Sequence, residues 1–88
     1  MKFKILIVED EKEILDDLSK ILTISGYEVV STNNCNEAMD FAINSNLDLI
    51  ISDILLPEFD GYDFLKQLQE NSATASIAFF CWVVMNTF

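Results

Sequence analysis

Short apolar runs alternate along the chain with segments in which apolar residues recur at helical spacing. The runs predict four buried strands, at residues 3–8, 27–31, 47–52 and 77–84. Because strand and helix alternate with short connections, we predict an α/β fold in which helices cover both faces of a parallel sheet. No internal repeat is present, so residues 1–88 are expected to form a single small domain.

Three helices with apolar stripes are predicted, at residues 11–25, 37–43 and 61–70. Ser25-Gly26 provides a stop for the first helix. Asn34 and Asp60 are suited to cap the second and the third, since short polar side chains accept hydrogen bonds from the first free amides of a helix. Residues 57–60 are expected to form a loop.

The charge balance excludes several partners. Fifteen acidic residues stand against five lysines, which gives a formal net charge of -10 at pH 7. Such a field repels nucleic acid and anionic membrane surfaces, so neither is expected as a partner. The longest apolar stretch, residues 77–85, is shorter than the roughly 20 residues that span a bilayer.

The chain has no histidine, which removes the usual zinc ligand and every catalytic triad built on an imidazole. Cys35 and Cys81 are isolated, with no paired spacing and no secretory signal before them. We therefore expect a cytoplasmic protein that does not use a hydrolytic triad.

Three acidic residues follow two of the predicted strands. Glu9 and Asp10 come after the first strand, and Asp53 comes after the third. If these strands lie side by side and parallel, the carboxylates share the sheet edge at which open α/β folds bind ligands. Grouped carboxylates repel one another, so a shared proton or a divalent cation must compensate them. With only oxygen donors nearby, Mg²⁺ is the expected cation, and its open positions can take phosphate oxygens.

A carboxylate can act as the nucleophile in phosphoryl transfer, and Asp53 is the candidate because it follows a rigid strand. Glu9 and Asp10 lie at a strand-to-helix junction that is suited to holding the metal. A simpler alternative exists for each residue by itself. Acids before a helix are stabilised by the helix dipole, and an aspartate after a strand is a common turn residue.

Two blocks carry a family resemblance. Residues 7–11 read Ile-Val-Glu-Asp-Glu, and residues 53–65 read Asp-Ile-Leu-Leu-Pro-Glu-Phe-Asp-Gly-Tyr-Asp-Phe-Leu. From about residue 4 to residue 80 the chain resembles the CheY-like receiver domain of two-component response regulators. The resemblance implies a flavodoxin-like, doubly wound parallel sheet that is incomplete here. Four of the five receiver strands and three helices are present, whereas the fifth strand and the last helices are missing.

The resemblance also implies a role for each candidate residue. Asp53 is expected to be the phosphoacceptor, which receives its phosphoryl group from a sensor histidine kinase or a phosphotransfer protein. Asp10 is expected to bind Mg²⁺ directly, Glu9 directly or through water, and Leu55 through its backbone carbonyl. Asp53 is expected to share the same ion. The chain would then be a signalling domain of a phosphorelay and not an enzyme.

Departures from the family begin in the fourth predicted strand. Val83 stands where the family has a serine or threonine that contacts the phosphoryl group, and valine cannot donate that hydrogen bond. The family's phosphate-pairing lysine, at the end of its fifth strand, has no counterpart. Residues 71–88 form an atypical tail without charge, explained by a shifted reading frame past Phe80 or by natural shortening. Phosphorylation is therefore expected to be slow or absent.

Alternatives to this function differ in how well the sequence supports them. Without a fifth strand, the fourth becomes an uncharged edge, which favours self-association, and a non-phosphorylated pseudo-receiver that works by binding is the alternative. A phosphatase with an aspartyl nucleophile needs a second aspartate where Leu55 stands. Gly26 and Gly61 are the only glycines, so no phosphate-binding glycine loop can be formed.

Overall fold

Strands and helices alternate in the computed structural model, which describes residues 2–53, 55–56 and 59–82. The strands are β1 (Lys4–Val8), β2 (Glu28–Thr32), β3 (Leu49–Asp53), β4 (Leu55–Leu56), β5 (Phe59–Asp60) and β6 (Ala78–Trp82). The helices are α1 (Lys12–Ile24), α2 (Cys35–Asn44) and α3 (Gly61–Glu70).

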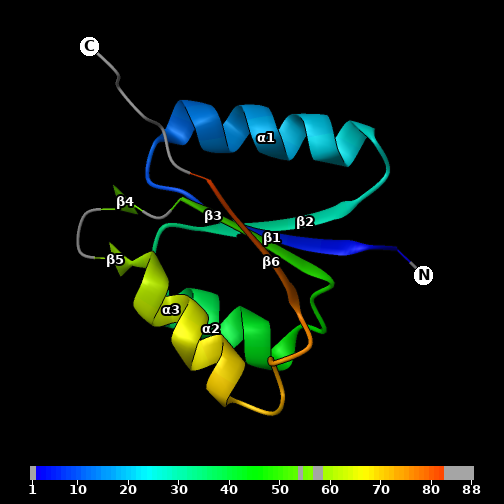
Figure 1. Cartoon of the computed structure of the whole chain (residues 1–88). Helices are drawn as coiled ribbons and strands as arrows, with labels where there is room; N and C mark the ends of the chain where they lie inside the picture. The colour runs from blue at the N-terminus through cyan, green and yellow to red at the C-terminus, as the bar shows by residue number, and fades with distance from the viewer. Residues whose placement is uncertain (1, 54, 57–58, 83–88) are drawn as a thin grey trace.

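Four of the strands form one parallel sheet in the order β2-β1-β3-β6. Figure 1 shows α1 on one face of this sheet and α2 and α3 on the other. The predicted doubly wound architecture is confirmed, with four strands in the main sheet and three helices among the described residues. The order arises because the chain places β3 beside β1, opposite β2, before it adds β6 at the outside.

Local signals in the sequence account for two helix ends. The Asn34 side chain accepts a hydrogen bond from the Glu37 amide at 3.0 Å, so this residue caps α2 as predicted. At the end of α1, Gly26 adopts a φ of 97°. The Gly26 amide donates to the Thr23 carbonyl and the Tyr27 amide to the Leu22 carbonyl, both at 3.1 Å. This pair of hydrogen bonds ends the helix with a residue in the left-handed conformation. Glycine adopts that conformation at a lower cost in free energy than other residues do.

The prediction of a loop at residues 57–60 was wrong in part. Leu55–Leu56 and Phe59–Asp60 pair as a short antiparallel ladder, and α3 follows at once. Asp60 directly precedes the helix, but its predicted capping side chain lies outside the described residues. The fourth predicted strand is observed as β6 and is described as far as Trp82, so Val83 also lies outside the description.

The main core fills the face of the sheet that α2 and α3 cover. Its buried members come from the strands, the two helices and the connection before β3, and they are Leu6, Val8, Ala38, Ala42, Leu47, Ile50, Phe64 and Leu68. Ile5 and Ile7 alternate with Leu6 and Val8 along β1 and are also buried. Side chains alternate across a strand, so these two isoleucines face α1.

Candidate functional site

The candidate site lies at the carboxyl edge of the sheet, where β1 and β3 end side by side. The two strands pair in parallel, and Val8 is the register partner of Ser52. One residue further along each strand come Glu9 and Asp53. The predicted meeting of the two strand ends is therefore confirmed for the backbone. The shared carboxylate cluster, which also requires the Asp53 side chain, stays a prediction.

Glu9 is a buried acid, with a relative exposure of 2%. Its Oε1 accepts hydrogen bonds from the amides of Asp10 at 3.0 Å and Glu11 at 3.1 Å. Its own amide donates to the Thr32 carbonyl at 3.1 Å, which ties this turn to the end of β2. Oε1 therefore satisfies two amides of the turn that leads into α1, which is a structural role for one of the two Glu9 carboxylate oxygens.

Asp10 lies between β1 and α1 with an exposed side chain. It faces a depression of about 400 Å³ that is shared with Ser31 and Thr32 at the end of β2. The nearest lysine in sequence, Lys12, forms an ion pair with Asp16 at 3.0 Å instead. No ion pair to Asp10 is found among the described residues, so its carboxylate is available to a cation from solvent.

The second strand also contributes to this edge, which was not predicted from the sequence. Ser31 and Thr32 end β2, and Asn33 and Glu37 belong to the turn and helix that follow. The rule that ligands lie beyond the carboxyl ends of parallel strands applies to β2 as much as to β1 and β3. These polar residues could have been found by applying it to all three strands.

The donor set fits a hard divalent cation. Glu9 and Asp10 are the predicted carboxylate ligands, and the backbone carbonyl of Leu55, which begins β4 two residues after Asp53, is the predicted carbonyl ligand. Among the described residues alone, no three acidic or cysteine side chains lie close enough together to hold a metal ion. Oxygen donors without thiolate or imidazole are typical of Mg²⁺ sites. The residues present are therefore compatible with a magnesium ion.

Cys35 lies at the same edge, at the beginning of α2, but it is a poor nucleophile. Burial raises the pKa of the Cys35 thiol above its ordinary value, and the negative charge of Asp63 raises it further. Both effects disfavour the thiolate, which is the reactive form. The thiol therefore stays protonated at neutral pH.

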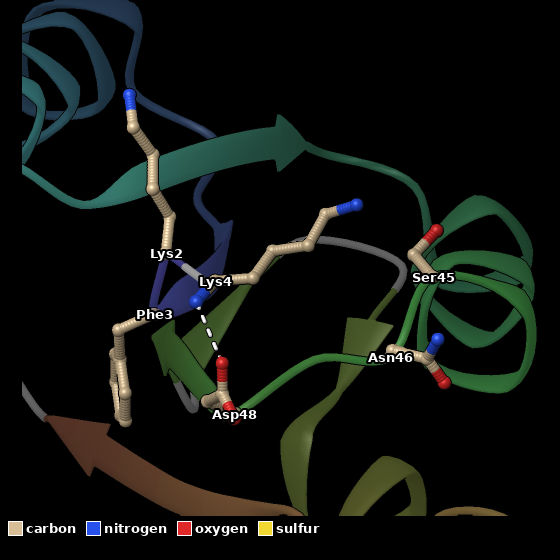
Figure 2. Close-up of a pocket in the computed structure, with 6 residues that line it drawn as sticks. All are labelled: Lys2, Phe3, Lys4, Ser45, Asn46 and Asp48. Carbon is tan, nitrogen blue, oxygen red and sulfur yellow. Dashed lines mark hydrogen bonds between the residues drawn. The ribbon is translucent and has the colours of Figure 1, made fainter.

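A second hollow, of about 600 Å³, lies at the opposite edge, where β1 and β3 begin. Figure 2 shows its lining residues, which are Lys2, Phe3, Lys4, Ser45, Asn46 and Asp48. The Lys4 amide donates to Asp48 Oδ2 at 2.8 Å, and Lys4 Nζ forms an ion pair with Glu28 at 3.1 Å. These polar groups connect the N-terminal ends of the strands to one another. We therefore assign them a structural role and do not take this hollow as the candidate site.

Comparison with known proteins decides the family. The family model described as the response regulator receiver domain matches residues 5–85. The chain belongs to this family. The match covers both strand ends that carry Glu9, Asp10 and Asp53. Receiver domains are in general signalling modules that bind Mg²⁺ and interact with histidine kinases or phosphotransfer proteins.

Curated relatives of this receiver domain are longer than the chain. A probable transcriptional regulator, ycf29 of Pyropia yezoensis, is 36% identical over 77 residues, which cover 88% of this chain and 35% of that protein. The alkaline phosphatase synthesis transcriptional regulatory protein PhoP of Bacillus subtilis is 40% identical over 70 residues, or 80% of this chain and 29% of that protein. The chain thus spans about a third of the length of these relatives.

Solved receiver structures share the fold. The receiver domain of a signal transduction histidine kinase from Syntrophus aciditrophicus superposes with a TM-score of 0.85 at 34% identity, over 96% of this chain and 64% of that one. Vibrio cholerae CheY4 superposes with a TM-score of 0.90 at 28% identity, over 99% of this chain and 72% of that one. The flavodoxin-like assignment is therefore confirmed.

In the described part of the chain, no helix combines the length and the apolar character that a bilayer crossing requires.

Proposed function

We propose that this receiver domain accepts a phosphoryl group on Asp53 from a sensor histidine kinase or a phosphotransfer protein, with Mg²⁺ as cofactor. The observation that carries the proposal is the parallel pairing of β1 and β3, which sets Glu9 and Asp53 directly after the partners Val8 and Ser52. Acids that lie far apart in the sequence are thereby brought to one edge of the sheet. A cytoplasmic location fits this role.

The proposed reaction is an in-line displacement at phosphorus. A carboxylate oxygen of Asp53 forms the new P–O bond while the P–N bond to the donor histidine breaks, and the departing imidazole nitrogen keeps the electron pair. The product is an aspartyl phosphate. When bound, Mg²⁺ supplies the positive charge that offsets the anionic oxygens gathered at this edge.

Each metal-site residue has a distinct part in this proposal. Asp10 is exposed and free of ion pairs with described residues, so it can bind the ion directly. Glu9 Oε1 already accepts two amide hydrogens, so Glu9 binds through its other oxygen or through a water. Leu55 contributes its main-chain carbonyl, and the nature of its side chain matters little.

We propose that the transfer is slow in this chain. Val83 occupies the position where the family has a hydroxyl, and a valine side chain cannot donate a hydrogen bond to the phosphoryl group. Loss of a charge-assisted hydrogen bond to a transition state costs about 2.7–4 kcal/mol in comparable oxyanion sites. Phosphorylation over hours rather than seconds is the expected consequence.

The experiment is incubation of the full chain with Mg²⁺ and acetyl phosphate, followed by intact mass measurement. We expect one phosphoryl adduct on the wild type and none on Asp53→Asn. Asp48→Asn is the matched control, because Asp48 lies at the opposite edge of the sheet and the amide oxygen of an asparagine there can still accept from the Lys4 amide. An adduct that persists in Asp53→Asn contradicts the proposal.

Magnesium dependence is tested separately from the acceptor. Chelation of Mg²⁺ and the variant Asp10→Asn should each lower the rate of adduct formation at least tenfold, as losses at metal sites typically do. Far-ultraviolet circular dichroism of each variant checks that the fold is retained. An unchanged rate under chelation would show that the ion has no part in the reaction.

A second candidate function is a pseudo-receiver that acts by association through β6. The observation that favours it is the place of β6 at the edge of the main sheet, with residues 78–82 all uncharged. Such an edge can add a strand from another chain. Light scattering over a range of concentrations should show self-association that Ala78→Lys weakens. A monodisperse monomer at high concentration would count against it.

A further inference from the structure

A short turn joins β2 to α2 beside the candidate metal site. It runs from Thr32, the last residue of β2, through Asn33 to Asn34, which caps α2. Thr32 and Asn33 line the same depression of about 400 Å³ as Glu9 and Asp10. No residue of this turn has a part in the reaction proposed above, although the turn borders two of the proposed metal ligands.

Thr32 accepts a hydrogen bond at each of its two oxygens. Its carbonyl oxygen accepts from the Glu9 amide at 3.1 Å, and its side-chain Oγ1 accepts from the Asn34 amide at 3.0 Å. The residue is only 6% exposed, so water has little access to replace these bonds. One buried threonine is therefore connected both to the end of β1 and to the cap of α2.

The two hydrogen bonds are linked through one peptide unit. The Thr32 carbonyl belongs to the peptide between Thr32 and Asn33. That peptide lies inside the ring that is closed when Oγ1 accepts from the amide two residues later, a local turn that serine and threonine favour. Because a peptide unit is planar and rigid, the closed turn fixes the direction of this carbonyl. The Thr32 hydroxyl thus orients the acceptor for the Glu9 amide.

Glu9 is held from two sides as a result. On the side of α1, its Oε1 accepts from the amides of Asp10 and Glu11. On the side of β2, its own amide donates to the carbonyl of Thr32. When the backbone and one carboxylate oxygen of a buried residue are both fixed, few positions remain for the other oxygen. The place of the Glu9 carboxylate beside Asp10 is therefore set before an ion arrives.

We propose that Thr32 is a positioning residue for the magnesium site, and that its hydroxyl acts through Glu9 from the end of β2. The inference rests on the proposed function in one respect, which is that Glu9 and Asp10 bind the ion. Thr32 is not itself a metal ligand in this proposal. Loss of a group that orients a metal ligand typically lowers metal affinity by about 10- to 100-fold.

The first test is a Mg²⁺ titration of the full chain and of the variant Thr32→Val. Amide chemical shifts of the isotope-labelled protein at Glu9 and Asp10 give the Kd without any phosphoryl donor. Valine is close to threonine in shape but has no side-chain oxygen, so the Asn34 amide loses its acceptor. We expect the Kd for Mg²⁺ to rise about tenfold. An unchanged Kd would overturn the proposal.

Two further variants separate positioning from a general loss of stability. Thr32→Ser keeps the hydroxyl and should bind Mg²⁺ within about twofold of the wild type. Asn34→Ala removes the side chain that caps α2 but keeps the backbone amide that donates to Thr32, so it should lower stability and leave the Kd unchanged. Urea denaturation measures the free energy of unfolding of each variant. Equal weakening of Mg²⁺ binding by Asn34→Ala and Thr32→Val would contradict a positioning role.

Hydrogen exchange of the wild type tests the same link without any substitution. Coupling between two sites is reciprocal, so a turn that strengthens Mg²⁺ binding is itself strengthened by Mg²⁺. Exchange of the Asn34 amide should slow by up to about tenfold at saturating Mg²⁺. The Lys4 amide is the matched control, because it also donates to a side-chain oxygen, that of Asp48, but lies at the opposite edge of the sheet. Identical exchange of the Asn34 amide with and without Mg²⁺ would refute the link.

Failure of this inference and failure of the proposed function give different results. If the wild type and Thr32→Val bind Mg²⁺ equally, only the role of Thr32 is refuted, and acetyl phosphate should still label Asp53. If the wild type shows no Mg²⁺-dependent shifts at Glu9 and Asp10, the magnesium site is refuted and the role of Thr32 with it.

Discussion

The two faces of the sheet differ in how completely they are covered. On the face of α2 and α3, both helices contribute fully buried side chains: Ala38 and Ala42 from the first, and Phe64 and Leu68 from the second. On the other face, α1 has a strong apolar stripe but no buried residue. The two layers follow from similar sequence patterns, yet only one of them forms a closed core.

The difference teaches that an amphipathic pattern fixes which side of a helix faces the sheet but not how much of it is buried. Burial of α2 and α3 is mutual, because the two helices contact each other as well as the sheet. Helix α1 contacts β1 and β2 and has no neighbouring helix among the described residues. Stability should therefore depend mainly on the closed face.

The largest expected effect comes from comparing one phenylalanine on each face. Phe64 is fully buried and packs 6.0 Å, between ring centres, from Phe79, so Phe64→Ala should cost about 3–5 kcal/mol. Phe80→Ala on the open face should cost about 1 kcal/mol or less. Urea denaturation of both variants measures the two free energies of unfolding. Equal losses would contradict the contrast between the faces.

A buried hydroxyl forms a hydrogen bond with the last turns of α3 on the closed face. Thr74 is buried, and its Oγ1 donates to the Leu68 carbonyl at 2.7 Å. Thr74→Val keeps the shape but leaves that carbonyl without this donor, so the free energy of unfolding should fall by about 1–3 kcal/mol. Ser72→Ala, an exposed change in the same turn, is the control and should have almost no effect.

The cap of α2 is expected to have a moderate effect. Asn34→Ala removes the side chain that accepts from the Glu37 amide, which should lower the free energy of unfolding by about 1 kcal/mol. The neighbouring Asn33→Ala serves as the matched change, since Asn33 is exposed outside the helix. Thermal denaturation followed by circular dichroism would reveal a difference of several degrees. Identical midpoints would rule out a stabilising cap.

The smallest expected effect is a gain in the free energy of unfolding from a change at the N-cap of α1, on the open face. Glu11 occupies the N-cap position of α1 and makes no capping hydrogen bond with its side chain. Glu11→Ser introduces a favoured capping hydroxyl and should raise the free energy of unfolding by about 0.5–1 kcal/mol. A loss of stability instead would show that the acidic charge at this helix end matters more than the cap.

Much of the fold could be predicted because its signals are local. Asn34 and Gly26 mark helix ends through their own side-chain chemistry and backbone freedom, and both were identified from the sequence. The ladder of Leu55–Leu56 and Phe59–Asp60 was missed because two residues are too few to show a period. The incomplete cover of α1 could not be predicted from its apolar stripe, since helical periodicity does not show which elements pack beside a helix.

The candidate site was predictable to the level of the backbone. Strand ends in a parallel sheet meet at one edge, so the approach of Glu9 and Asp53 followed once two parallel strands were inferred. The use of Glu9 Oε1 by the amides of Asp10 and Glu11 could not be read in advance. It depends on the rotamer of the Glu9 side chain, and a carboxylate near the beginning of a helix can adopt several rotamers that are stabilised there.

The strand order β2-β1-β3-β6 has a consequence for synthesis on the ribosome. When residue 32 has emerged, β1 and β2 can already pair, and β3 then joins the free side of β1. Strand β6 joins the free side of β3 last. Each strand of this sheet thus pairs with an exposed edge as the nascent chain lengthens. No strand pair that formed earlier has to separate before a later strand can join.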